Sequence, residues 1–385
     1  MLASAGSRHQ ANGLLPLGCA DLLLTHHRRG PIDLPRTQTK TDPKRTSRRY
    51  LELADATRSQ RNSDRTYHRK QNKLDIETLN GKLNEVRNGL KGVIKGKADV
   101  IDMVLTSVLA EGSILLEDVP GVGKTTLAKS LASLIDLKFQ RVQCTPDLLP
   151  ADILGNSIFQ PASGTFEFRP GPIFCDLLIA DEVNRASPRT QSALLEAMAE
   201  GQVTVDATRY QLERPFLVIA TQNPVGYEGT FPLPESQLDR FLMRLTMDYP
   251  DHASEIELLL NQPTDDPDFE LKSVMRRDEL TALQGLVREV NVDRKIASYV
   301  VDLATATRFD SRVRTGCSPR GAKMLLRAAQ ARALLEGRQF VLPDDIQALA
   351  APVLSHRVSL RNASLNASDA IAIQNEIVQQ VEVPV

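Results

Sequence analysis

A glycine loop between an apolar segment and a helix constrains the fold of this chain more than any other feature. The largely apolar residues 113–116 predict a buried strand, and a helix is predicted to begin directly after the loop. Gly121 and Gly123 allow a turn that points backbone N–H groups at an anion, and the helix N-terminus adds partial positive charge there. Lys124 can reach the β- and γ-phosphates of a nucleotide, and the Thr125 hydroxyl can ligate Mg²⁺. The predicted phosphate-binding residues are Pro120, Gly121, Val122, Gly123, Lys124, Thr125 and Thr126.

The loop departs from the general phosphate-loop pattern, G-x-x-x-x-G-K-[ST], at one position. Asp118 stands where the first glycine of that pattern belongs. Taken alone, the segment is therefore also compatible with an ordinary glycine-rich turn between a strand and a helix. The motifs further along the chain favour nucleotide binding.

An apolar strand that ends in two carboxylates follows about 60 residues later. In the segment 175–186, Asp181 would hold Mg²⁺ through water, and Glu182 would polarise an attacking water molecule. A strand followed by an acidic turn is the alternative, and the upstream glycine loop favours the functional interpretation.

A second buried strand, within residues 215–224, ends at Asn223. A polar side chain at the carboxyl end of a central parallel strand lies at the ligand-binding edge of an open sheet. Asn223 could there hydrogen-bond a γ-phosphate or orient the water, although an Asn-Pro pair is also a common turn.

Two arginines are candidates for contacts with the nucleotide. Arg240 lies near the end of a predicted helix that runs into a strand, and in ring-forming ATPases such an arginine reaches a neighbour's nucleotide. Local pairing on the surface is the alternative, and Arg244 is a weaker candidate for the same role. Arg320 falls in the first turn of a helix that begins at Ser318-Pro319, where a cation opposes the helix dipole unless it serves an anionic ligand.

The alternation of strands and helices predicts an α/β domain over residues 76–255, with a parallel sheet covered by helices. Only helical periods follow, which predicts an all-α domain over residues 270–385. Residues 1–75 are basic and polar and are predicted to be disordered. That segment could be a basic tail for acidic partners, an Arg-rich transit-like segment, or translated sequence upstream of the true start.

Composition narrows the class of protein. The 385 residues are 42% hydrophobic and 25% charged with a net charge of −1, which is typical of a globular protein and favours neither nucleic acid nor membrane. The four cysteines form no C-x-x-C pair, so a reducing compartment is expected. No run of eighteen apolar residues occurs, so no membrane span is expected.

From about Glu77 to Val358 the chain resembles the MoxR family of AAA+ ATPases. In that family Glu-Asp-Val-Pro typically precedes the loop glycine, so Asp118 is no departure from the family pattern. The resemblance implies a P-loop domain with a five-stranded parallel sheet and an all-α lid. The matching segments are EDVPGVGKTTLA (117–128), TPDLLPADILG (145–155), FEFRPGPIF (166–174), LLIADEVNRASPRTQSALLEAMAEGQVTV (177–205), PFLVIATQNPVGYEGTFPLPESQLDRFLMRL (215–245) and GCSPRGAKMLL (316–326).

The resemblance also implies two hairpin insertions. One covers residues 156–172 with its turn at Ser163-Gly164, and the other covers residues 202–214 with its turn at residues 206–208. Such hairpins project toward a ring pore or a client protein, although each could be a surface ribbon without a partner.

In function, the resemblance implies a cytoplasmic, Mg²⁺-dependent ATP hydrolase that assembles as a homo-oligomeric ring, expected to be a hexamer. It would remodel or mature a protein client, together with a partner that carries a von Willebrand factor A domain. A nucleic-acid motor or a chelatase-like subunit is one alternative, and a nucleotide-binding scaffold without turnover is another. Aromatic residues are only 4% of the chain and no basic stripe accompanies them, so nucleic acid is not expected as a partner. The scaffold is disfavoured because Lys124, Thr125, Asp181, Glu182, Asn223, Arg240 and Arg320 are all present.

Overall fold

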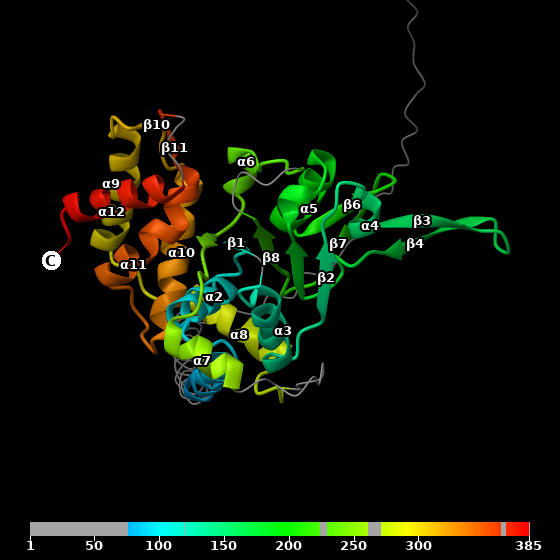
Figure 1. The fold of residues 1–385 in the computed structure, drawn as a ribbon, viewed down its shortest axis with the longest axis horizontal. Helices are drawn as coiled ribbons and strands as arrows, with labels where there is room; N and C mark the ends of the chain where they lie inside the picture. Colours follow the sequence, from blue (N-terminus) through cyan, green and yellow to red (C-terminus); the bar gives the residue numbers. More distant parts are fainter. Residues whose placement is uncertain (1–75, 120, 224–228, 261–270, 363–366, 385) are drawn as a thin grey trace, which may run out of the picture. The chain divides into compact units, whose positions relative to one another are not determined.

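The structure is a computed structural model that describes residues 76–119, 121–223, 229–260, 271–362 and 367–384 (Figure 1). The predicted disordered segment 1–75 and the loop residue Pro120 lie outside the described residues.

A five-stranded parallel sheet forms the centre of the α/β part, in the strand order β2-β5-β8-β1-β9. Every residue of β5 and of β8 is buried, as expected for central strands with helices on both faces. The predicted parallel sheet is therefore confirmed, with β9 as a short edge strand of three residues. The strands are β1 (Ile114–Glu117), β2 (Phe139–Gln143), β5 (Leu177–Asp181), β8 (Leu217–Gln222) and β9 (Met243–Leu245).

Side chains of the central strands alternate between two apolar clusters, one on each face of the sheet. In β5, Leu177 and Ile179 belong to the first cluster, whereas Leu178 and Ala180 belong to the second. The first cluster includes a helix over residues 76–93, α2 (Ala98–Leu109) and α3 (Lys124–Leu134). The second includes α4 (Pro150–Leu154) and α5 (Pro188–Glu200), and Figure 1 shows these helices on the other side of the strands.

The start and the end of α5 follow from its sequence. The Ser187 side chain accepts a hydrogen bond from the Thr190 N–H, and Pro188 occupies the first helical position, where a missing N–H costs nothing. Gly201 ends the helix with φ of 64°, a left-handed conformation that glycine adopts without strain. The 3-10 turn η1 (Val183–Arg185) connects β5 to this helix.

The C-terminal part is helical, as predicted, and its apolar side chains belong to the same cluster as those of α2 and α3. Ser318 caps α10 by accepting a hydrogen bond from the Gly321 N–H. A short antiparallel pairing of β10 with β11, which the helical periods do not indicate, joins two segments of this part. Its elements are α8 (Arg277–Val287), α9 (Arg294–Phe309), β10 (Val313–Thr315), α10 (Pro319–Leu335), α11 (Pro343–Leu354), η2 (Ser355–Arg357), β11 (Ser359–Leu360) and α12 (Ala367–Gln380). Between β8 and α8 lie α6 (Glu235–Leu238) and α7 (His252–Leu260).

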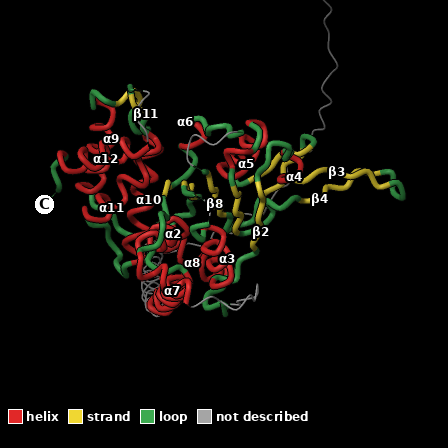
Figure 2. Tube along the Cα trace, in the orientation of Figure 1, coloured by secondary structure: helices red, strands yellow, loops and turns green. Residues whose placement is uncertain are grey.

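Both expected hairpins are present. The first pairs β3 (Gly155–Gln160) with β4 (Thr165–Pro170), and the second pairs β6 (Gln202–Val205) with β7 (Thr208–Gln211). Figure 2 shows the β3–β4 hairpin as a long ribbon that extends away from the helices. The ring of Phe168 on β4 stacks on that of Tyr210 on β7, with centroids 3.9 Å apart, so the two hairpins contact each other near their bases.

Candidate functional site

A cavity of about 330 Å³ lies at the carboxyl ends of β1, β2, β5 and β8. It is lined by Gly121, Gly123, Lys124, Thr125, Thr126, Arg141, Gln143, Asp181, Glu182, Thr221 and Asn223. The structure thus brings the predicted glycine loop, the acidic pair and Asn223 to one place, although they are separated by up to about 100 positions in the sequence. Among the residues that the structure describes, Val122, Arg240 and Arg320 do not line this cavity.

The glycine loop has the backbone conformation that its sequence predicts. Gly121 has φ of 89° and Gly123 has φ of 90°, a region that residues with a side chain rarely adopt. A Cβ added at Gly121 would meet no atom within 4 Å, so the requirement for glycine there is one of backbone conformation and not of space. Gly123 is the N-cap of α3, and the helix therefore points its N-terminus, with its partial positive charge, at the cavity.

Lys124 is the first residue of α3, and its side chain is buried. Its Nζ donates a hydrogen bond of 2.8 Å to the backbone carbonyl of Asp118, which fixes the ammonium at the loop. Burial lowers the pKa of Lys124, although the nearby charges of Asp118, Asp181 and Glu182 oppose that shift. The group is thus a cation held at the wall of the cavity among carboxylates.

Asp118 has a structural role at the position where the general loop pattern has glycine. Its Oδ2 accepts hydrogen bonds from the backbone N–H of Asp248, at 3.0 Å, and from that of Met247. The carboxylate therefore ties the glycine loop to the segment that follows β9.

Arg244, the weaker candidate for contact with a neighbour's nucleotide, is paired within its own chain. It lies on β9 and forms an ion pair with Glu117 of the adjacent strand β1. Both side chains are largely buried, and burial lowers the pKa of Arg244.

The acidic pair at the end of β5 is held by hydrogen bonds from two neighbouring strands. Asp181 Oδ2 accepts from Arg141 Nε of β2 at 2.6 Å, and Asp181 Oδ1 accepts from the Thr221 hydroxyl of β8 at 3.3 Å. The same Thr221 hydroxyl accepts from the Glu182 N–H at 2.9 Å. Thr221 therefore fixes both members of the pair relative to β8.

Glu182 lies in a left-handed backbone conformation, with φ of 55°, that turns it out of the strand. Its carboxylate accepts hydrogen bonds from Arg185 at 2.9 Å, Gln143 at 3.1 Å and Asn223 at 3.2 Å. Burial raises the pKa of Glu182, but the hydrogen bonds from Arg185 and Asn223 outweigh it, so the pKa is lowered. The group is ionised at neutral pH and can accept a hydrogen bond from water.

Three lining residues were missed by the sequence analysis: Arg141, Gln143 and Thr221. Arg141 and Gln143 are two positions apart on β2, which places both on one side of the strand. Two polar residues that alternate along a predicted strand could have indicated that one side of this strand faces a polar site. The sequence did not show that β2 pairs with β5, which is what brings them to the acidic pair.

The two candidate arginines, which do not line the cavity, have contacts elsewhere in the chain. Arg240 Nη1 donates a hydrogen bond of 3.0 Å to the backbone carbonyl of Leu195 in α5. Arg320 is half-exposed at the start of α10, and its Nε lies 4.0 Å from a carboxylate oxygen of Asp239.

The donor atoms at the cavity suit a magnesium ion that is bound together with a nucleotide. The oxygen-bearing side chains of Thr125 and Asp181 both line the cavity, and Mg²⁺ prefers oxygen ligands. Within the described ranges no group of three or more His, Cys, Asp or Glu side chains could form a metal cage of its own. One or two protein ligands, completed by phosphate oxygens and water, are the usual arrangement for Mg²⁺ at a nucleotide.

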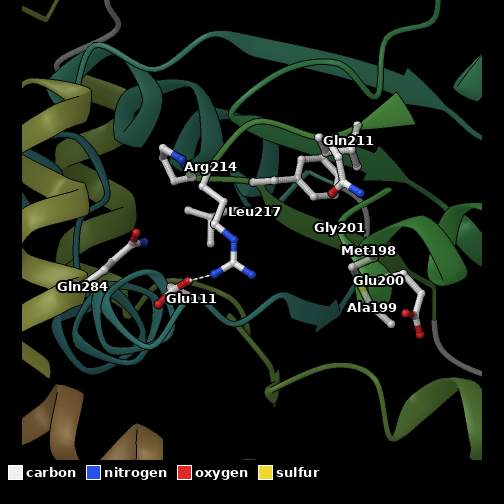
Figure 3. A pocket seen from close by; sticks show the side chains of 12 residues that line it. Glu111, Met198, Ala199, Glu200, Gly201, Gln211, Arg214, Leu217 and Gln284 are labelled. Carbon is white, nitrogen blue, oxygen red and sulfur yellow. Dashed lines mark hydrogen bonds and ion pairs between the residues drawn. The ribbon is translucent and has the colours of Figure 1, made fainter. Parts of the chain in front are cut away.

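A second cavity, of about 200 Å³, lies near the amino end of β8 and is lined in part by Leu217 (Figure 3). The Arg214 guanidinium points into it and is paired with Glu111, at 2.6 Å. None of the predicted site residues that the structure describes lines this cavity. The cavity at the glycine loop is therefore the candidate site.

Comparisons with known proteins agree with this site. Residues 113–243 match the ATPase family associated with various cellular activities (AAA), and residues 305–379 match the AAA lid domain. Chaperone MoxR1 of Mycobacterium tuberculosis is 36% identical over 322 residues, which cover 80% of this chain and 83% of that relative. The chain belongs to the MoxR family of AAA+ ATPases.

Two further similarities extend over most of the chain. The Bacillus subtilis protein YeaC, which is described as uncharacterized, is 49% identical over 312 residues, covering 81% of this chain and 97% of that relative. The crystal structure of a Cytophaga hutchinsonii protein, designated an ATPase by inference, has a TM-score of 0.76 and 37% identity, covering 82% of this chain and 99% of that one. This MoxR-family protein is thus an ATPase with an AAA+ domain and a C-terminal helical lid. No helix in the described ranges has the length and apolar character that crossing a membrane requires.

Proposed function

We propose that this MoxR-family ATPase is a Mg²⁺-dependent enzyme that works as a homohexameric ring and uses ATP hydrolysis to remodel a protein client. The observation that carries the proposal is the convergence of Lys124, Asp181, Glu182 and Asn223 on one cavity at the N-terminus of α3. A cation, a metal-ligating carboxylate, an ionised base and a polar amide are the groups that phosphoryl transfer to water requires.

Each side chain at the cavity has a distinct proposed role. Backbone N–H groups of residues 121–126 and the Lys124 ammonium would bind the phosphates, and Thr125 with Asp181 would hold Mg²⁺. The metal ion, when bound, neutralises charge that develops on the phosphate oxygens. Glu182 would orient the attacking water and accept its proton, and Asn223, 3.2 Å from that carboxylate, would keep it aimed at the γ-phosphate.

The proposed ring rests on the resemblance to the family, and the position of Arg240 supports it. Its guanidinium is hydrogen-bonded to Leu195, and within the described residues it does not line the cavity of its own chain. We assign it to the nucleotide of the adjacent subunit. Arg320, which is half-exposed and 4.0 Å from its nearest carboxylate, is loosely held and would bind the nucleotide of its own subunit from the lid.

The proposed boundaries are 76–255 for the AAA+ domain and 270–385 for the lid.

The β3–β4 hairpin supports a protein client. Phe159 and Phe166 are both exposed on it, with ring centroids 5.3 Å apart, and exposed aromatic pairs are typical of surfaces that bind proteins. One relative is named a chaperone, which supports the same role. We propose a partner with a von Willebrand factor A domain and a cytoplasmic location on the resemblance to the family.

A subunit-mixing experiment tests the proposed ring and its catalytic residues together. Arg240→Ala alone should bind ATP but lose about 10³–10⁵ in turnover, the scale of an arginine finger. Lys124→Ala alone should not bind ATP, because its ammonium is the cation fixed at the loop by Asp118. Mixed rings should regain part of the activity, because the Lys124→Ala subunit supplies Arg240 to a neighbour with an intact loop.

Two controls make the result specific. The double variant Arg240→Ala/Lys124→Ala supplies neither group and should give no rescue when it is mixed with Arg240→Ala. Arg276→Ala, which removes an arginine from a solvent-exposed pair with Asp278, should keep the wild-type ATPase rate. Full activity in an isolated monomer, or no rescue in mixed rings shown to form, would contradict the proposal.

A further inference from the structure

Arg141 places a second cation on the carboxylate that is proposed to hold the metal. Its Nε donates a hydrogen bond of 2.6 Å to Asp181 Oδ2, and its Nη2 donates one of 3.0 Å to the side chain of Gln143. Both Arg141 and Asp181 line the cavity at the glycine loop. The guanidinium therefore lies where a divalent cation would approach Asp181.

The two cations compete for one carboxylate. A divalent cation held at Asp181, directly or through a bound water, would lie close to the Arg141 guanidinium, and like charges repel each other at short range. The other oxygen of Asp181 already accepts from the Thr221 hydroxyl. Metal binding at Asp181 is thus disfavoured while Arg141 is paired with it, and it is favoured when Arg141 moves away.

Arg141 is able to move, because the pair is asymmetric in exposure. The Asp181 side chain is only 9% exposed, whereas that of Arg141 is 50% exposed. Its long side chain extends from β2 toward solvent at the cavity, unlike the buried side chain of Lys124. The Asp181 side chain is nearly buried at the end of a central strand, and burying an unpaired carboxylate costs free energy. A paired cation offsets that cost.

We propose that Arg141 is a positioning residue that competes with Mg²⁺ for Asp181. It holds the carboxylate in place and neutralises its charge. When the metal ion binds with the nucleotide, the hydrogen bond from Arg141 to Asp181 breaks and the guanidinium moves away. The inference rests on the proposed assignment of Asp181 to the metal ion.

The experiment uses two readouts that do not depend on turnover. Binding of Mn²⁺ alone to the full-length protein is measured by electron paramagnetic resonance, and binding of ATP in the presence of EDTA is measured by calorimetry. Arg141→Gln should raise the Mn²⁺ affinity about three- to tenfold, because its competitor is gone, and should weaken metal-free ATP binding by a similar factor, because Asp181 then repels the phosphates. Arg141→Lys, which keeps the charge but donates from one point, should lie between the wild type and Arg141→Gln in both measurements.

A double-variant comparison separates this role from a general structural effect. In an Asp181→Asn background, Arg141→Gln should raise the Mn²⁺ affinity by much less than it does in the wild type, because no carboxylate remains for the two cations to compete for. Arg276→Gln, in an exposed pair with Asp278, should change neither readout.

The outcomes distinguish this inference from the proposed function. If the wild type binds ATP but Arg141→Gln leaves both affinities unchanged, the role of Arg141 is overturned and the nucleotide site stands. An equal effect of Arg141→Gln with and without the Asp181 carboxylate would also overturn that role. If the wild type does not bind ATP with or without Mg²⁺, the proposed site and this inference are overturned together.

Discussion

We predict that Arg357→Met destabilises the protein because Arg357 joins the lid to the edge of the sheet. The Arg357 side chain is only 1% exposed, and its Nε lies 3.0 Å from Asp239 Oδ1, directly after α6. Its other nitrogens donate to the carbonyls of Leu242, at 3.2 Å, and of Phe241, in the segment that leads into β9. Burial lowers the pKa of Arg357 to about 10, although Asp239 opposes the shift, so the charge is retained at neutral pH.

The expected size of the effect follows from what the substitution leaves behind. Methionine has a similar length and keeps most of the apolar contacts, but Asp239 and the carbonyl of Leu242 lose their donor. Breaking a buried ion pair by removing one partner costs about 3–5 kcal/mol. Asp239 is 26% exposed, so water replaces part of the lost interaction and a value near ~3 kcal/mol is expected. For a chain of this size, that loss lowers Tm by roughly 4–5 °C.

Unfolding free energies from denaturant titration, with Tm from thermal melting, measure the effect. The matched control is Arg276→Met, in a pair whose side chains are 68% and 70% exposed, for which a change below about 0.5 kcal/mol is expected. The double variant Asp239→Asn/Arg357→Met should be less destabilised than the sum of its single variants, because it leaves no unpaired charge. A loss below about 0.5 kcal/mol in Arg357→Met, or strict additivity, would refute the reasoning.

Two further predictions concern the acidic residue of the site and the stability of the lid. Glu182→Gln should retain ATP binding, measured by calorimetry, and should lose about 10² or more in the rate of phosphate release, since it cannot accept a proton; a wild-type rate would exclude Glu182 as the base. His356 is buried, and burial, followed by the charge of Arg357, lowers its pKa well below the usual value. The folded protein therefore keeps His356 neutral while the unfolded chain takes up a proton below about pH 6.5, so stability falls as pH falls, by up to about 1.4 kcal/mol per pH unit. His356→Gln should flatten the slope of unfolding free energy between about pH 6.5 and 5, and an unchanged slope would count against this origin of acid sensitivity.

Local sequence was sufficient for the parts of the site that depend on backbone conformation. Positive φ at Gly121 and Gly123 requires glycine, and Lys124 follows at the start of the helix, so the loop is encoded within a few residues. The central strands were predictable because strands buried on both faces are continuously apolar. The hairpin turn at Asp206 and Ala207, where φ is 49° and 64°, was placed only through the resemblance to the family, since alanine is not a residue that local rules favour there.

Contacts between residues distant in the sequence were decided only by the tertiary structure. Arg141 meets Asp181 because β2 pairs with β5, and no local pattern states which strands become neighbours. In the sequence, Asp118 is only a departure from the general loop pattern. The tertiary structure gives it a role, because the segment after β9 supplies two N–H donors to its carboxylate. The sequence gives no sign that Arg357 is buried. Its partners, Asp239 and the carbonyl of Leu242, are known only because the structure packs the lid against the segment after α6. The physical reason is that periodicity and turn chemistry specify the face and the end of each element, whereas strand order and the pairing of buried charges are settled by packing of the whole chain.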